Sequence, residues 1–144
     1  MAKRKPVHRV LSQGIHDRFE KGGAGLPRLL EPTLRVEAAV GREFGFVLHL
    51  ERAKGMRVLW EIDHPGVPDA ADPRGVGGPA LPPFRGSEFV PTPVWDFYLG
   101  DALWEPLERM VGPWRLSVTL DGKLLHRAEF LVFPPPDAEP DGPQ

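Results

Sequence analysis

The sequence predicts an all-β protein built as a sandwich of two antiparallel sheets. Apolar residues recur at every second position in several segments, which is the period of a strand with one buried face. The 144 residues include 18 prolines and 16 glycines, a content that suits frequent turns and disfavours long helices. About seven short strands, one short helical turn and many turn signals are typical of an immunoglobulin-like β-sandwich.

The chain is long enough for one domain with a sizeable core, and 41% of its residues are hydrophobic. We place this single sandwich domain at residues 13–133. Residues 1–12 are basic and carry no apolar period, so they are predicted to be a disordered tail. Residues 134–144 combine prolines with acidic residues and are predicted to be a second disordered tail.

Four strands are expected in the first half of the domain. The clearest lies at 44–50, where Phe44, Phe46, Leu48 and Leu50 occupy every second position. The same alternation, or a short edge segment bounded by glycines, predicts the others, which lie at 14–20, 29–40 and 57–63.

Residues 65–83 differ from the rest of the chain because they hold six prolines and four glycines. Such a segment cannot be a central strand or a helix interior, and a loop of this length is usually functional or disordered. Two further strands are predicted at 84–90 and 94–99. Residues 106–111 are predicted to form the helical turn, because Pro106 suits its first position and Gly112 follows its end.

Residues 112–133 are predicted to form the last hairpin, turning at Asp121-Gly122. A two-residue turn would place charged residues opposite the apolar row, so we predict a three-residue loop, 120–122, with Gly122 in the left-handed conformation of a bulge. In that register one face holds Trp114, Leu116, Val118, Leu124, His126, Ala128, Phe130 and Val132. The hairpin is then scaffold rather than site.

Composition excludes several functional classes. The net charge of −2 and the pI of about 6.2 give no field that favours nucleic acid or an anionic membrane. The absence of cysteine excludes disulfides, thiol catalysis and thiolate metal sites. No apolar run approaches the ~20 residues of a membrane helix, and no secretory core follows the basic start, so a cytoplasmic location is expected. The basic arm formed by Lys3, Arg4, Lys5 and Arg9 is interpreted as a solubilising tail.

The histidines do not indicate a catalytic or metal site. His126 falls on the core face of the hairpin, where a hydrogen-bonded structural histidine is expected. His49 and His64 lie in adjacent strands but diverge, since His49 is on the polar side and His64 continues the apolar row. No spacing matches a zinc or calcium site. We therefore expect no catalytic residue, no cofactor and no metal.

Other motifs also favour a structural interpretation. Residues 75–80 fit the dinucleotide pattern G-x-G-x-x-A, but the prolines that follow block the helix this motif needs. Ser87 and Ser117 have no nearby histidine that would complete a triad. The carboxylates around the long loop are expected to be solvated; they are Glu61, Asp63, Asp69 and Asp72.

Short motifs along residues 14–133 resemble the bacterial family known as domain of unknown function 3859. They are Gly14-Ile15, Gly41-Arg-Glu-Phe-Gly-Phe46, His64-Pro65, Trp104-Glu105, Gly112-Pro-Trp114 and Phe130-Leu-Val132. The resemblance implies an immunoglobulin-like sandwich and carries no catalytic residues.

These observations favour a non-enzymatic β-sandwich that binds another protein through an edge strand or the loop 65–83. The alternative is a small-ligand-binding protein or weak hydrolase that uses the Asp63–His64 end of the sandwich. A concave pocket beside His64 would favour the alternative, and an unprotected sheet edge would favour the interaction module. No nucleic-acid or membrane partner is expected, and the oligomeric state is left open.

Overall fold

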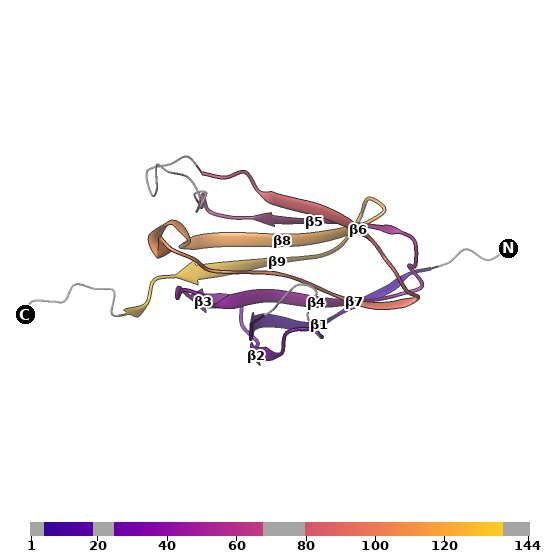
Figure 1. The fold of residues 1–144 in the computed structure, drawn as a ribbon, viewed down its shortest axis with the longest axis horizontal. Helices are drawn as coiled ribbons and strands as arrows, with labels where there is room; N and C mark the ends of the chain where they lie inside the picture. Colours follow the sequence, from indigo (N-terminus) through magenta and orange to yellow (C-terminus); the bar gives the residue numbers. More distant parts are fainter. Residues whose placement is uncertain (1–4, 19–24, 68–79, 137–144) are drawn as a thin grey trace, which may run out of the picture.

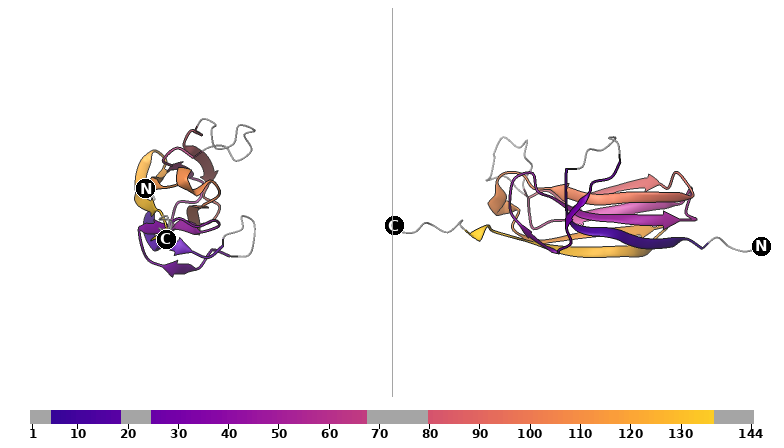
Figure 2. Two further views of the ribbon diagram at one scale, coloured as in Figure 1. Left: turned by 90° about the vertical axis from the view of Figure 1, so that its left-hand side faces the viewer. Right: turned by 90° about the horizontal axis from the view of Figure 1, so that it is seen from below.

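The computed structural model describes residues 5–18, 25–67 and 80–136, which form nine strands in two facing sheets (Figures 1 and 2). The four-stranded sheet has the order β2 (Leu29–Glu31), β1 (Val7–His16), β4 (Glu43–Glu51) and β7 (Val94–Ala102). The five-stranded sheet has the order β3 (Arg35–Glu37), β9 (Lys123–Phe133), β8 (Gly112–Leu120), β5 (Arg57–Asp63) and β6 (Phe84–Phe89). The predicted sandwich is confirmed, with one parallel pair, β3 and β9, among antiparallel neighbours.

The core lies between the two sheets and is built on the alternating row of β4. Phe44, Phe46, Leu48 and Leu50 are all fully buried, as the sequence predicts. The Phe44 ring meets Trp114 of the opposite sheet edge-on, with 5.3 Å between ring centroids. No helix in the described part of the chain is long and apolar enough to span a membrane.

The predicted boundary of the first tail is wrong, because residues 7–12 belong to strand β1. Val7 pairs with Glu51 and the pairing continues along β4 to His16. Backbone hydrogen bonds to β4 hold this segment, while most of its side chains are exposed and therefore show no apolar period. Lys5 and Arg9 are thus described, whereas Lys3 and Arg4 lie outside the described residues.

The predicted strand at 29–40 is two strands that belong to different sheets. β2 pairs with β1, and β3 pairs with β9. Pro32 lies between them and has no N–H to donate to a ladder, so the chain crosses from one sheet to the other at this point. The predicted turn at 106–111 is a 3₁₀ helix, η2, at Leu107–Arg109.

The core-facing row of the hairpin is as predicted from Trp114 to Val118 and from His126 to Val132, but the turn and the position of the bulge differ from the prediction. Leu120 pairs with Lys123, and Asp121 and Gly122 both have positive φ, 48° and 86°, so the turn has two residues rather than three. The change of face comes instead from a bulge, because Val118 pairs with His126 while Thr119 pairs with Leu124. Leu124 therefore points outward and is exposed, which corrects its predicted place in the core row, and Leu125 packs against the core.

Replacing Gly122 by alanine should destabilise the domain by about 1–2 kcal/mol, because an L-residue is strained at positive φ. An added Cβ would meet no atom within 4 Å, so the cost comes from the backbone alone. Urea denaturation of Gly122→Ala, with the exposed neighbour Lys123→Ala as the control, measures this. Equal midpoints for the two variants would contradict the turn geometry.

Candidate functional site: a groove beside the edge of β7

The Asp63–His64 end does not present a catalytic histidine. His64 follows β5, and its Nδ1 accepts the backbone N–H groups of Gly66 and Val67 at 3.1 and 3.2 Å. Nε2 must then carry the proton, and it donates to the carbonyl of Pro82 at 3.1 Å. With both ring nitrogens bonded to the backbone, His64 anchors the two ends of the loop 65–83 and has no nitrogen left for a general base.

The other acidic and hydroxyl candidates are dispersed over the outer face of the five-stranded sheet. Asp63 pairs with Arg115 across the ladder, and Glu61 makes an ion pair with Arg85 at 3.1 Å. Ser87 and Ser117 occupy the same outer face and are not beside a histidine of this sheet. Within the described ranges, no three His, Cys, Asp or Glu residues are grouped so that they could hold a metal. Asp69, Asp72 and the glycines of the 75–80 motif lie outside the described residues.

Two polar groups missed by the sequence analysis lie at this end of the sandwich. Asp101 faces inward opposite Phe44, and burial raises the pKa of its carboxyl to about 6, against the opposing influence of Ala102 N–H and His64. The buried indole N–H of Trp104 has no hydrogen-bond partner among the described residues. The alternation of Trp95, Phe97 and Leu99, continued by one step, would have placed Asp101 in the inward row.

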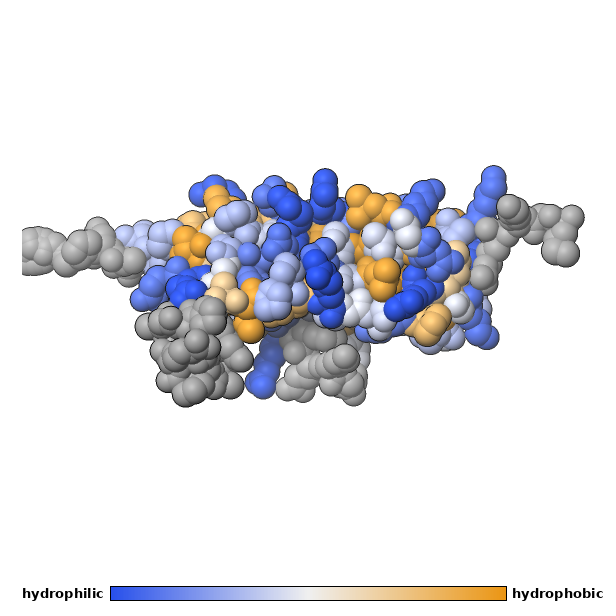
Figure 3. Space-filling view, turned by 90° about the horizontal axis from the view of Figure 1, so that it is seen from above, coloured by the Kyte–Doolittle hydropathy of each residue, from blue (hydrophilic) through white to orange (hydrophobic). Residues whose placement is uncertain are grey.

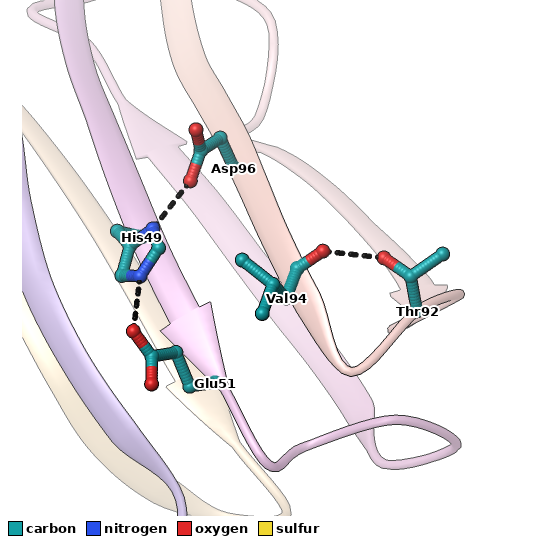
Figure 4. A network of polar contacts seen from close by, with 5 residues as sticks. All are labelled: His49, Glu51, Thr92, Val94 and Asp96. Atoms are coloured by element: carbon teal, nitrogen blue, oxygen red, sulfur yellow. Dashed lines mark hydrogen bonds and ion pairs between the residues drawn. The ribbon is translucent and has the colours of Figure 1, made fainter.

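The histidine predicted on the polar side of β4 joins this strand to β7. His49 lies between two carboxylates, with Nε2 2.8 Å from Glu51 and Nδ1 2.6 Å from Asp96 (Figure 4). The hydrogen bond to Glu51, followed by that to Asp96, raises the pKa of His49, and the nearby Arg9 opposes this effect. The protonated ring donates to both carboxylates and ties the two strands together on their outer face.

A second polar contact holds β7 to β4 on the same outer face. The Tyr98 hydroxyl donates to the Glu43 carboxylate at 2.8 Å, and both residues are buried. Burial, with the Glu43 charge beside it, raises the pKa of Tyr98, so the phenol stays protonated. The His16 ring meets Tyr98 edge-on at 5.2 Å, which extends the contact to β1.

A groove of about 350 Å³ runs between β7 and the β5–β6 side of the opposite sheet. Its lining is mainly apolar and includes two acidic residues; the residues are Leu26, Trp60, Ile62, Glu88, Asp96, Phe97, Tyr98, Leu99 and Gly100. Trp60 lies over Gly86, where a Cβ would collide with the indole ring. An edge strand was predicted from the sequence in general terms, but none of these groove residues was predicted as part of a site.

The outer edge of β7 pairs with no described strand; at its two ends the Thr92 hydroxyl donates to the Val94 carbonyl and the Ala102 N–H donates to the Asp101 carboxylate. Leu103 N–H donates to the Arg42 carbonyl and the Pro93 carbonyl accepts the Arg52 N–H, so the backbone groups of odd-numbered β7 residues point toward β4. Backbone groups of the even-numbered residues, including Asp96 and Gly100, therefore point away from β4. β7 pairs with β4 over nine residues without a register shift, and no described strand pairs with its outer edge.

On the opposite open side of the sandwich, formed by β1 and β9, the strand pairing is irregular. β1 has a register shift between Val10 and Ser12, and β9 has its bulge at Leu125. His126 of β9 also bonds to Gln13 of β1 at 2.7 Å and packs on Phe46, so it is hydrogen-bonded in the core-facing row, as predicted. Bulges twist an edge away from further pairing.

Residues 4–132 match the family described as Domain of unknown function (DUF3859). The chain belongs to this family. An immunoglobulin-like protein of Pseudomonas aeruginosa, a solved structure, shares the DUF3859 chain's fold with a TM-score of 0.60 and 22% identity, covering 88% of this chain and 96% of that one. Alkylpurine DNA glycosylase AlkC of Pseudomonas fluorescens, solved bound to DNA with an abasic site analogue, gives a TM-score of 0.41 and 16% identity over 69% of this chain and 28% of its own. No curated protein matches the sequence.

Asp101→Asn should stabilise the domain at neutral pH. Because the folded-state pKa of about 6 lies above the ordinary 3.8, folding favours the protonated acid, and the penalty grows as pH rises from 3.8 to 6. The difference between these two pKa values corresponds to a loss of folding stability of up to about 3 kcal/mol above pH 6. Asn keeps the acceptor for Ala102 N–H. Denaturation at pH 4 and pH 7.5 measures this, and a gain of equal size at both values would contradict the burial of a charged carboxylate.

His49→Gln should destabilise the domain in a pH-dependent way. The raised folded-state pKa means that the stabilisation by His49 is fully present below the ordinary value of 6.5 and is lost as pH rises through the folded value. Unfolding curves of both proteins between pH 6 and pH 9 should therefore converge as pH increases. A difference that is constant over this range would show that the charged pairs contribute nothing.

Proposed function

We propose that this DUF3859 chain is an interaction module that binds an extended segment of another protein as an added strand on the outer edge of β7. The observation that carries this proposal is the unpaired regular edge lying beside a mainly apolar groove. Added strands bind through main-chain hydrogen bonds, and pockets for alternate side chains supply the specificity.

The state of the histidines supports binding rather than catalysis. His64 is held by the loop backbone and His126 by Gln13, as described above. His16 bonds to the Ser12 hydroxyl and to the Gly14 carbonyl. His49 is held between carboxylates, where its raised pKa favours the protonated ring, which cannot accept a further proton.

The surface on the side of β5 and β6, which lie uppermost in Figure 1, also supports strand addition. On the face drawn in Figure 3, the coloured, described residues form separate apolar patches among hydrophilic ones. A broad apolar interface of the kind found in obligate complexes is not favoured by such a surface. Strand addition needs only a narrow apolar strip, because the backbone supplies the hydrogen bonds.

Small-ligand binding at the end of the sandwich is a second candidate function, favoured by the unpartnered Trp104 indole N–H and the buried Asp101 carboxylate. A fragment screen by NMR tests it through the Trp104 indole resonance. Fragments that shift this resonance in the native chain, and lose affinity in Asp101→Asn, would support a ligand site. An indole signal unmoved by the whole screen would reject it.

Peptides selected from a displayed library of random 12-residue sequences should bind the native chain and slow hydrogen exchange at the amides of Asp96 and Gly100. These amides point away from β4 and would gain a partner only from an added strand. Leu26→Lys should weaken binding at least tenfold, because it places a charge on the apolar lining. Phe89→Ala, an exposed apolar change on the opposite face of β6, is the matched control.

The proposal fails if the library yields no binder. It also fails if the selected peptides bind without protecting these two amides, or if Phe89→Ala weakens binding as much as Leu26→Lys.

A further inference from the structure

We infer that the segment accepted by β7 is basic, with a lysine or arginine two residues from an apolar side chain. This inference rests on the proposed function and adds the chemistry of the partner. The apolar side chain would contact Trp60 and Ile62, and the cation would lie at the end of the groove marked by Glu88.

The charge of the groove is one-sided. Glu88 and Asp96 are the two acidic residues of its lining, and no described Lys, Arg or His lines it. Glu88 has no ion-pair partner among the described residues. Arg85, the basic residue of β6, makes its ion pair with Glu61. The Asp96 carboxylate lies on the outer face, where it shares the protonated His49 with Glu51, which Arg52 and Arg9 also face. The charge that a bound cation would offset inside the groove is therefore that of Glu88.

The two acidic residues lie at the same end of the groove because of the chain connection, with the Glu88 side chain on the inward face of β6. β6 ends at Phe89 and β7 begins at Val94, so Glu88 and Asp96 are both close to the short connection between the sheets. The apolar part of the groove extends away from this end, toward Leu99 and Gly100 on one wall and Ile62 on the other. A bound strand would thus meet charge first and apolar surface next.

The spacing follows from the strand register. Gly86 pairs with Trp60, and Glu88 is two residues further along β6. Two residues of a strand span about 7 Å, and side chains two positions apart lie on the same face. A strand added along β7 would place a cation near Glu88 and an apolar side chain near Trp60 at positions i and i+2.

Three fluorescein-labelled ten-residue probes test the inference with the full chain. In the first probe every second residue is threonine. The residues between the threonines are lysines in one half and valines in the other, so that at the middle one lysine and one valine are two positions apart. The second has glutamate in place of lysine, and the third is the first with proline at two central threonines. Fluorescence anisotropy at low and moderate salt gives the dissociation constants.

The lysine probe should bind about fivefold or more tightly than the glutamate probe, with the preference reduced by added salt. Glu88→Lys should abolish or reverse the preference, while Glu129→Lys, an exposed carboxylate on the outer face of β9, should leave it unchanged. The proline probe should bind the native chain weakly, because proline removes a ladder donor.

The outcomes separate the two proposals. Equal binding of the lysine and glutamate probes, or a preference that Glu88→Lys leaves intact, would overturn the basic partner while keeping strand addition. Binding of the proline probe as tightly as the lysine probe, or no binding of any probe, would overturn strand addition itself.

Discussion

The contact between the inward row of β4 and the opposite sheet constrains the rest of the molecule. Phe44 packs against both Trp114 and Phe130, with ring centroids 5.3 and 5.2 Å apart, and the Trp114 indole N–H bonds to the Met110 carbonyl at 2.8 Å. Truncating a buried tryptophan costs about 3–5 kcal/mol, against a typical domain stability of about 5–15 kcal/mol. A slip of β4 by one residue would exchange this row for Gly45, Val47 and His49, so the register of β4 is fixed.

A fixed β4 also fixes the strand that carries the proposed site. β7 is aligned with β4 over nine pairs, with core packing on one face and the Tyr98–Glu43 and His49–Asp96 contacts on the other. An edge held on both faces loses little conformational freedom when a segment adds to it. Such preorganisation favours binding, because the entropy of ordering the strand has been lost already on folding.

The alternating rows were the part of the structure that the sequence could predict. Phe44 to Leu50 and Trp114 to Val118 have a period of two, and burial enforces that period wherever one face meets the core. The first strand was missed over residues 7–12 because its exposed side chains carry no pattern while its backbone bonds to β4. The groove was missed because Trp60, Glu88 and Asp96 come together only when the two sheets pack, and no local spacing encodes that approach.

The hydrogen bonds from His64 to both ends of the loop 65–83 have a consequence for the length and sequence that this loop can have. Its ring bonds to both ends of the loop 65–83, and Leu81 N–H bonds to the Val67 carbonyl at 2.8 Å, with Val67 fully buried. The chain therefore leaves and re-enters the sandwich through a closed base that is independent of what lies between. Because loop-closure entropy grows slowly with length, residues can be inserted or exchanged beyond this base without strain reaching β5 or β6. The loop beyond this base is therefore a suitable place to insert a foreign sequence.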